Sequence, residues 1–335
     1  MMLWFHKGVW ISKRGKATAE ELDPPEVKRV AVIRHAALGD MILTRNFLIE
    51  LRKAFPNAFV TFSVASNYMA GIPVDLVDRV HLLDTANRWL PYFRNMRDLQ
   101  TQDIIFDLAA TTRSMWMCKV NKAKLKIGFP YHIAQRFFYD IVVPRSDMYF
   151  EVDGMLNALK IFGFVPQMPH VYNLPGIPLK RDKPYILYFT TASTQRKCWP
   201  IDRFVGLITK MSETMPKFEH LIQEGTGVWE SIRGTMEDLR NKRNVCIIGP
   251  GTVENLIAVV KGATMVISND TSVRNIAVAA TVPSVGVFIS PPVFRYLPTI
   301  GNHHIVFNRD GSAPDVEKVF ESSLALLQKI EHVNP

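Results

Sequence analysis

The sequence predicts an α/β protein with two Rossmann-like domains, each built on a mostly parallel sheet and facing the other across a cleft. Three observations support this fold class. Short β-branched runs, typical of strands buried on both faces, alternate with segments of helical periodicity. The chain has 335 residues, more than the ~250–300 at which a single core usually divides. A proline-rich segment, residues 166–184, separates two halves that repeat the same alternation.

The first domain is expected to span residues 27–165, after an N-terminal extension of residues 1–26. Its buried strands are predicted at Val27–Ile33, Ala58–Ser66, Arg79–Asp84 and Asp103–Ala110. Glu151–Phe164 has the periodicity of a closing helix. The extension combines lysines with Trp4, Phe5 and Trp10, a composition that indicates either peripheral contact with the inner, anionic membrane surface or a frayed terminus.

The second domain is expected to span residues 185–335. Its strands are predicted at Tyr185–Thr190, Phe218–Gln223, Asn244–Ile248, Thr264–Ser268 and Pro283–Phe288. A helix is expected from Ile201, and Asp315–Ile330 has apolar residues on one face, as in a helix capped by Ser312 or Asp315. Residues 166–184 contain five prolines and are predicted to form the linker between the domains.

The segment Arg34–Arg45 (RHAALGDMILTR) connects the first strand to a helix through a turn of small residues. Asp40 stands where an N-cap is expected, and Pro56 is expected to end the helix. In open α/β sheets such a turn lies at the carboxyl edge of the strands, where ligands bind. Asp40 is therefore either a plain helix cap or a functional carboxylate, and the local sequence leaves both open.

Several enzyme classes are excluded because their motifs are missing. Neither domain has a G-x-G-x-x-G turn after its first strand, which argues against a dinucleotide-dependent dehydrogenase. The sequence also lacks a Walker A loop, a G-x-S-x-G elbow and an HExxH helix. The nine histidines are scattered apart from the pair His303–His304, so no metal site and no bound cofactor are predicted.

The charge of the chain and its cysteine content indicate the kind of partner and the cellular compartment to expect. Forty Lys and Arg against 31 Asp and Glu give a net charge of +9, which indicates an anionic partner. Acidic residues are spread along the chain, so nucleic acid is an unfavoured partner. Cys118, Cys198 and Cys246 lie far apart, which fits a reducing cytoplasm and no disulfide framework. We expect no secretory signal, and the uncharged run Ile276–Phe294 contains three prolines, unlike a membrane span.

Two segments of the second domain are suited to bind an anion. Thr190 and Thr191, with Lys197 nearby, follow its first strand. Residues 268–272 (SNDTS) lie between a later strand and a helix. Backbone N–H groups and hydroxyls at a helix start bind phosphate, and a lysine adds positive charge. Together, the two turns predict a diphosphate pocket.

Residues 111–129 form a basic run of the first domain without any acidic residue. Its charged side chains are Arg113, Lys119, Lys122, Lys124 and Lys126. Such a run is commonly a solvated helix face. Because it follows the end of a strand, it alternatively lines the cleft beside Asp40.

Four segments in the same order resemble the lipopolysaccharide heptosyltransferases, the ADP-heptose-using group of GT-B glycosyltransferases (glycosyltransferase family 9). They are residues 34–58 (RHAALGDMILTRNFLIELRKAFPNA), 107–129 (DLAATTRSMWMCKVNKAKLKIGF), 190–204 (TTASTQRKCWPIDRF) and 266–288 (VISNDTSVRNIAVAATVPSVGVF). Residues 190–204 are similar to the segment that contains the family's K-x-W-P motif, and residues 266–288 are similar to its S-N-D-[ST]-G-x-x-H segment. The resemblance covers roughly residues 27–330.

This resemblance implies an inverting, metal-independent transferase of GT-B architecture that moves a heptose from an ADP-sugar to an anionic, lipid-linked core saccharide. By position, Asp40 matches the proposed catalytic base. The positions matching donor contacts are Thr190, Thr191, Lys197, Asp270, Thr271, Ser272 and Asn275. Arg113 and Arg136 match acceptor contacts less directly, and Glu230 is a candidate ribose contact.

The chain departs from the family pattern where Ser272 replaces a glycine and Asn275 replaces a histidine. Asparagine can form hydrogen bonds but cannot carry the charge of a protonated imidazole. Two alternatives therefore stay open. One is a GT-B transferase that uses a different nucleotide sugar, and the other is a non-catalytic homologue that binds a sugar nucleotide.

Overall fold

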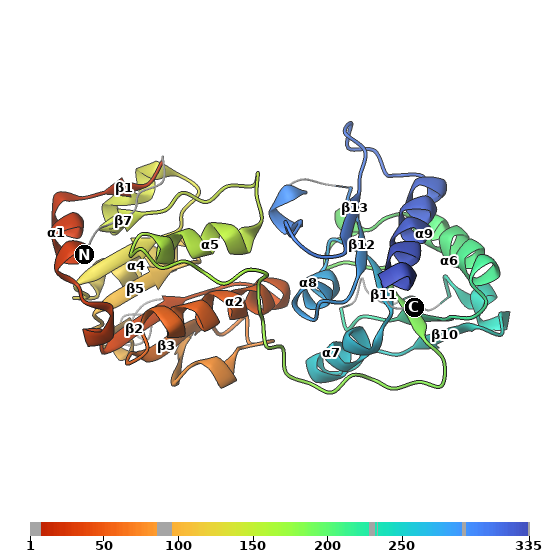
Figure 1. Cartoon of the computed structure of the whole chain (residues 1–335), viewed down its shortest axis with the longest axis horizontal. Helices are drawn as coiled ribbons and strands as arrows, with labels where there is room; N and C mark the ends of the chain where they lie inside the picture. Colours follow the sequence, from red (N-terminus) through yellow and green to blue (C-terminus); the bar gives the residue numbers. More distant parts are fainter. Residues whose placement is uncertain (1–7, 86–95, 228–231, 233, 290–292, 334–335) are drawn as a thin grey trace. The chain divides into compact units, whose positions relative to one another are not determined.

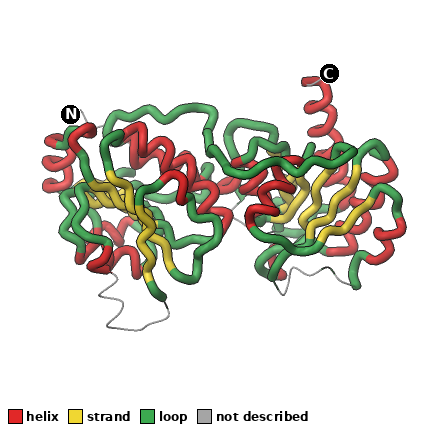
Figure 2. The backbone as a smooth tube through the Cα atoms, turned by 90° about the horizontal axis from the view of Figure 1, so that it is seen from below, coloured by secondary structure: helices red, strands yellow, loops and turns green. Residues whose placement is uncertain are grey.

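The computed structural model describes residues 8–85, 96–227, 232, 234–289 and 293–333. The chain divides into two compact units, Met1–Tyr172 and Asn173–Pro335. Each unit contains one sheet (Figure 1). Helices lie on both sides of each sheet (Figure 2), which is the layered arrangement predicted from the alternating pattern.

The first unit has a seven-stranded sheet in the order β1-β7-β6-β5-β2-β3-β4. The strands are β1 (Trp10–Ile11), β2 (Arg29–Ile33), β3 (Phe59–Ala65), β4 (Arg79–Leu83), β5 (Ile104–Asp107), β6 (Leu125–Gly128) and β7 (Ile141–Val142). All neighbouring pairs are parallel except β1 and β7. Its α-helices are α1 (Lys13–Glu21), α2 (Leu38–Ala54), α4 (Thr112–Val120) and α5 (Glu151–Lys160). The four predicted strands are present, whereas β1, β6 and β7 were not predicted.

Residues 10–26 are an ordered part of the first unit. Trp10 and Ile11 pair with β7 as an antiparallel edge strand. Helix α1 begins after Ser12, whose hydroxyl accepts a hydrogen bond from the backbone N–H of Gly15 (2.9 Å). The alternative of a frayed terminus is therefore wrong for this segment.

The second unit has a six-stranded parallel sheet in the order β10-β9-β8-β11-β12-β13. The strands are β8 (Tyr185–Phe189), β9 (Glu219–Gln223), β10 (Val245–Ile248), β11 (Met265–Asn269), β12 (Ser284–Val287) and β13 (His303–Val306). The α-helices are α6 (Ile201–Thr214), α7 (Val253–Gly262), α8 (Ser272–Ala279) and α9 (Val316–Val333). Asp315 accepts a hydrogen bond from the N–H of Lys318 (2.8 Å), so it caps α9 as one of the two predicted candidates. Strand β13 was not predicted.

The core of the second unit explains why its strands are mostly apolar. Helices α6 and α9 pack against each other on one face of the sheet. Phe204, Leu207 and Phe320 contribute to the buried cluster between these helices and the strands, together with Tyr188 and Ile267. Helices α7 and α8 contact each other and cover β8, β11 and β12. Because both faces are covered, the strands contain few polar positions.

In both sheets, the direction in which successive strands are added reverses at a central strand. In the first unit the chain moves outward from β2 to β3 and β4, then returns to the other side of β2 with β5. The second unit does the same around β8, with β11 on its other side. In open α/β sheets the crevice at this reversal, outside the carboxyl ends of the strands, is where ligands bind. The loops after β2, β5, β8 and β11 are therefore the positions at which this fold is expected to bind ligands.

The predicted linker, residues 166–184, forms hydrogen bonds first with the first unit and then with the second. Asn46 of α2 donates a side-chain hydrogen bond to the backbone oxygen of Val171 (3.0 Å), and Arg45 donates one to that of Tyr172 (2.8 Å). On the other side of the unit boundary, Lys261 of α7 donates to the backbone oxygen of Leu174 (3.0 Å). The extended proline-rich chain is therefore fixed along both units by side-chain hydrogen bonds.

No helix in the described part of the chain combines the length and the apolar character that crossing a bilayer requires.

Candidate active site

Asp40 lies in the first turn of α2, in the loop-to-helix junction that follows β2. The helix begins at Leu38 with Ala37 at its N-cap position, so the prediction that Asp40 is the N-cap is wrong. The small residues of the turn let the backbone enter the helix three residues earlier than the capping pattern indicated. Asp40 is thereby the third helical residue, and its side chain projects from the positive end of the helix dipole.

The carboxylate of Asp40 forms an ion pair with Arg34. The distance from Arg34 Nη2 to Asp40 Oδ1 is 3.3 Å. Arg34 is buried, whereas the Asp40 side chain is 21% exposed. Asp40 Oδ1 is itself buried and lacks a hydrogen-bond partner among the described residues. Asp40 is thus held electrostatically at the edge of the sheet while its capacity to accept a hydrogen bond stays unused.

Arg34 is shared with a buried network that sequence reasoning missed. Its Nη1 donates to the backbone oxygen of Leu108 (2.6 Å), and its Nη2 donates to Glu151 Oε1 (3.1 Å). Arg145 donates to the same Glu151 carboxylate through Nε (3.1 Å) and Nη2. The positive charges of Arg34 and Arg145 are therefore neutralised by the carboxylates of Asp40 and Glu151, and buried charges require such pairing.

His35 and Arg113 lie on the same edge as Asp40. Burial, with smaller contributions from the neighbouring His81 and from the positive charge of Arg113, lowers the pKa of His35 to about 4. His35 Nε2 is buried and unpartnered within the described chain. Arg113 is exposed near the start of α4, directly after β5. The structure therefore brings Asp40 and Arg113, two of the predicted residues, to the same carboxyl edge of the sheet and adds a neutral histidine.

Two basic residues of the first unit lie elsewhere. Lys124 forms a 2.8 Å ion pair with Asp103, which precedes β5, so it belongs to the amino edge of the sheet. The alternative in which the whole basic run lines the site is therefore wrong. Arg136 lies on the 3₁₀ helix η3 (Ile133–Phe138), and its guanidinium packs over the rings of Trp10 and Phe137.

In the second unit, the loops after β8 and β11 are joined by Asn269. Its side-chain NH2 donates to the backbone oxygen of Thr190 (2.8 Å), and its Oδ1 accepts from the N–H of Trp199 (2.8 Å). Lys197 Nζ forms a 2.8 Å ion pair with Asp270 Oδ2. Asn269 thus positions three of the predicted residues in one place. Sequence reasoning noted it in the SNDTS segment but gave it no role.

Three threonine hydroxyls on the same two loops have unsatisfied hydrogen-bonding capacity. The Oγ1 atoms of Thr190, Thr191 and Thr271 are buried and have no partner among the described residues. Thr271 occupies the N-cap position of α8 without capping it through its side chain. Buried hydroxyls are nearly always hydrogen-bonded in folded proteins. Unsatisfied hydroxyls beside a lysine at a helix start form an arrangement that can bind phosphate oxygens.

The start of α8 contains the two departures from the family pattern. Ser272 is its first residue, and Asn275 is buried in its first turn. Arg274, between them, is fully buried, and burial lowers its pKa to about 10. Its Nη1 donates to the backbone oxygen of Tyr296, and its guanidinium lies over the Phe288 ring. The candidate ribose contact Glu230 lies outside the described residues.

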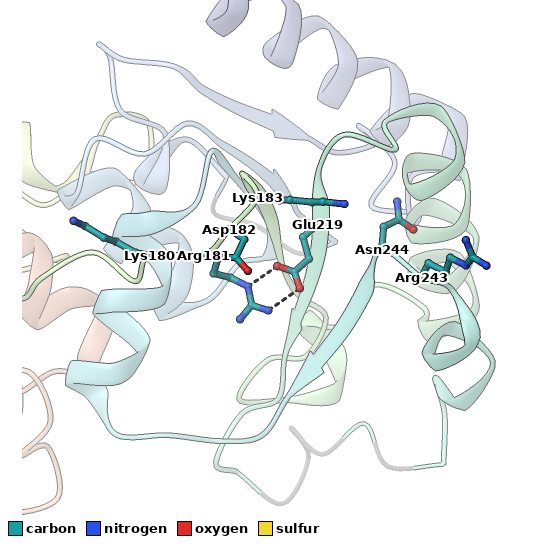
Figure 3. Close-up of a pocket in the computed structure, with 7 residues that line it drawn as sticks. All are labelled: Lys180, Arg181, Asp182, Lys183, Glu219, Arg243 and Asn244. Carbon is teal, nitrogen blue, oxygen red and sulfur yellow. Dashed lines mark hydrogen bonds and ion pairs between the residues drawn. The ribbon is translucent and has the colours of Figure 1, made fainter.

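A basic pocket of about 450 Å³ lies at the opposite edge of this sheet. Its lining residues, including Lys180, Lys183 and Arg243, precede the strands β8 and β10. Figure 3 shows Arg181 paired with Glu219, while Lys180 and Arg243 point away from that pair in opposite directions. Because the basic side chains do not converge and lie at the amino ends of the strands, this pocket is separate from the threonine and lysine cluster.

Within the described ranges, no group of three or more His, Cys, Asp or Glu side chains is placed to hold a metal ion. In the second unit, Lys197, the threonine hydroxyls and the start of α8 are groups that can stabilise negative charge.

Comparisons with known proteins identify the family and the fold. Residues 92–324 match the profile of glycosyltransferase family 9 (heptosyltransferase). A family 9 glycosyltransferase from Veillonella parvula is 17% identical, with a TM-score of 0.70 over 92% of this chain and 99% of that one. The heptosyltransferase WaaC of E. coli, solved with ADP, is also 17% identical, with a TM-score of 0.70 over 91% and 99%.

The ADP-heptose lipopolysaccharide heptosyltransferase II of E. coli is 13% identical, with a TM-score of 0.64 over 90% of this chain and 99% of that one. A comparison with curated protein sequences found no match. The predicted fold class, two parallel α/β sheets of the GT-B type, is confirmed. Since the family profile covers well over half of its residues, the chain belongs to glycosyltransferase family 9, the heptosyltransferase family, and is a glycosyltransferase.

Proposed function

We propose that the protein transfers a heptose from an ADP-sugar, with inversion, to an anionic, lipid-linked acceptor of the lipopolysaccharide-core type. The second unit binds the donor and the first unit binds the acceptor. The observation that carries the proposal is the set of unsatisfied hydroxyls of Thr190, Thr191 and Thr271 on the two loops that also carry the Lys197–Asp270 ion pair. A diphosphate supplies the oxygens that such a cluster can bind.

In this proposal Asp40 is the general base. It takes the proton from the acceptor hydroxyl as that oxygen attacks the anomeric carbon of the sugar. The bond to the nucleotide diphosphate breaks at the same centre, and the leaving group departs as a stable anion. A second carboxylic acid of the kind that glycosidases use is therefore unnecessary.

The second unit stabilises the charge that builds on the leaving diphosphate. Lys197 provides a positive charge, and the start of α8, with Thr271 and Ser272, provides hydroxyl and N–H donors. These groups supply the stabilisation that a metal ion supplies in other transferases, so the mechanism is proposed to be metal-independent. Asp270 shares Lys197 with the diphosphate and is available to accept hydrogen bonds from sugar hydroxyls.

The acceptor is proposed to be anionic because cations lie at the Asp40 edge. Arg113 is exposed there, and guanidinium groups bind phosphate and carboxylate in a bidentate manner. His35 is neutral over the physiological pH range because burial lowers its pKa to about 4, so it can act as a hydrogen-bond partner for a saccharide hydroxyl.

A different nucleotide sugar is the second candidate donor, and Asn275 and Arg274 are the observations that favour it. An amide at position 275 offers a hydrogen bond but no positive charge, and the buried Arg274 adds a fixed cation one residue away. A donor with other hydroxyl or acidic groups would suit this pair. A non-catalytic homologue that binds the nucleotide is the third candidate.

A donor panel separates these candidates. The purified protein is incubated with a heptose-deficient core saccharide and, in turn, with ADP-heptose, ADP-glucose, UDP-glucose and GDP-mannose. Product formation is followed by mass spectrometry, and binding of each nucleotide sugar is measured by calorimetry. We expect a heptose adduct with ADP-heptose alone. An adduct with another sugar would establish the second candidate, and binding without any adduct would establish the third.

A further inference from the structure

One face of the first unit combines exposed apolar rings with positive charge. It comprises Trp116, Lys119 and Val120 of α4 with Arg136 and Phe137 of η3, which we call the α4–η3 surface. Phe137 is 72% exposed, Trp116 49% and Val120 48%. The α4 residues are three and four positions apart, so they share one helix face. Large apolar side chains grouped in this way are unusual on a soluble surface and mark interaction sites.

Contacts between the two elements show that the surface is continuous. Lys119 Nζ donates a hydrogen bond to the backbone oxygen of Phe137 (3.3 Å). The ring of Trp116 meets that of Phe138 edge-on at 5.6 Å between centroids. Arg136 packs over the Phe137 ring, with 5.5 Å between its Cζ and the ring centroid. The apolar rings and the cations are therefore held side by side by the fold.

The charge of this part of the chain is uniformly positive. Residues 108–139 contain six Lys and Arg and no Asp or Glu, a net charge of +6. Lys124 is neutralised by Asp103, and Lys126 is half-buried in β6. The exposed cations Lys119, Lys122 and Arg136 remain on or beside the α4–η3 surface. A partner for this face must combine an apolar layer with negative charge.

We propose that the α4–η3 surface docks on the headgroup layer of an anionic lipid bilayer. Phe137, Trp116 and Val120 enter the boundary between headgroups and acyl chains, and the basic side chains contact the lipid phosphates. Helix α4 starts after β5 with Arg113 in its first turn, and the surface lies further along this helix, in the direction of the amino end of β6. The choice of a bilayer over RNA rests on the proposed function, because a lipid-linked acceptor requires the protein to work at a membrane.

A second copy of this chain is a less suitable occupant. In a two-fold symmetric dimer the same patch meets itself, which would place the cations of one copy against those of the other. An anionic bilayer neutralises the charge and accepts the apolar side chains in the same contact. Arg136, matched to an acceptor contact by resemblance, is on this reading a lipid-phosphate contact.

The test is co-sedimentation of the full chain with vesicles of phosphatidylcholine alone or with 30% phosphatidylglycerol. The variant F137S/K119Q removes one apolar and one basic contact at exposed positions. The control V165S/K160Q makes the same kinds of change at exposed positions of the first unit outside the surface. We expect the wild type and the control to bind anionic vesicles alike. F137S/K119Q should bind about tenfold or more weakly, since a basic residue near such a surface accounts for roughly fivefold and the phenylalanine adds to it.

Transfer assays distinguish failure of this inference from failure of the proposed function. F137S/K119Q should act on a water-soluble core saccharide at the wild-type rate and lose activity towards the acceptor embedded in vesicles. Vesicle binding that the surface variant and the control share equally, or no binding at all, would overturn the inference even if transfer occurs. A dimer that F137S/K119Q dissociates, or RNA binding that it abolishes, would also overturn it. Binding to vesicles without any transfer would leave the inference standing and remove the proposed function.

Discussion

Lys197 is the residue whose environment most directly links structure to donor binding. Its ammonium group pairs with Asp270 at 2.8 Å, and Thr190, Thr191 and Thr271 on the same two loops have buried hydroxyls without a hydrogen-bond partner among the described residues. The side chain is partly exposed, so it can reach an incoming phosphate while Asp270 keeps it in position. Charge-assisted hydrogen bonds of this kind are stronger than those between neutral groups.

Replacing Lys197 with methionine should weaken ADP binding roughly 10–150-fold, because a hydrogen bond to a charged group contributes about 1.5–3 kcal/mol. Calorimetric titration with ADP measures the effect. Lys242→Met is the matched control, because it removes another 2.8 Å ion pair of the same unit, Lys242–Glu213. Equal ADP affinity in K197M and the wild type would show that the diphosphate binds elsewhere.

At the level of single residues, the sequence revealed the groups that follow strands but missed their supports. Asp40, Thr190 and Asp270 are recognisable because each follows a buried strand in a motif. Arg34 and Glu151 are 117 positions apart, and no local pattern indicates that they meet at 3.1 Å. Asn269 is equally inconspicuous, since its role depends on the β8 loop lying beside β11. Such long-range pairs are fixed by the fold, and a single sequence contains no signal for them.

Strands with a strong local signal were predicted from the sequence, whereas strands with a weak one were missed. Central strands such as β2 and β11 are β-branched runs and were predicted within two residues. The strands β1 and β7 are two residues long, and β6 reads LKIG, with a lysine and a glycine in four positions. These strands form because a neighbour offers unpaired backbone groups, so their propensity alone could not identify them.

Gly128 of β6 provides a test at the level of this element. A Cβ atom at this position would collide with the ring of Tyr139, whose hydroxyl donates to the buried Asp107 (2.7 Å). Gly128→Ala should therefore destabilise the protein by about 1–3 kcal/mol. Its apparent melting temperature, followed by circular dichroism, should drop by several degrees.

The control is Gly206→Ala in α6, where the nearest atom, Val316 Cγ2, would be at an ordinary contact distance of 3.7 Å. Alanine is the better helix former, so this variant should be as stable as the wild type or more stable. A G128A protein that melts with the wild type would contradict the packing of Tyr139 against β6.

Across the whole molecule, the two units repeat one plan with different chemistry. In each, the first central strand is followed by the key loop: β2 leads to Asp40, and β8 leads to Thr190 and Thr191. The strand on its other side adds the second loop, with Arg113 after β5 and Asp270 after β11. The first unit thus supplies a carboxylate among cations, and the second supplies hydroxyls with a lysine. This division matches an acceptor that must lose a proton and a donor that must release a diphosphate.

The proposed mechanism depends most on Asp40 as the base, and the rate of heptose transfer by Asp40→Asn tests this role. Loss of a general base should lower the rate about 10²–10⁴-fold, while ADP affinity stays at the wild-type value because the donor residues are unchanged. Asp75→Asn is the control: it also removes a carboxylate paired with a buried arginine of the first unit, Arg45, and should leave transfer unaffected. A D40N enzyme that transfers heptose at the wild-type rate would contradict the mechanism.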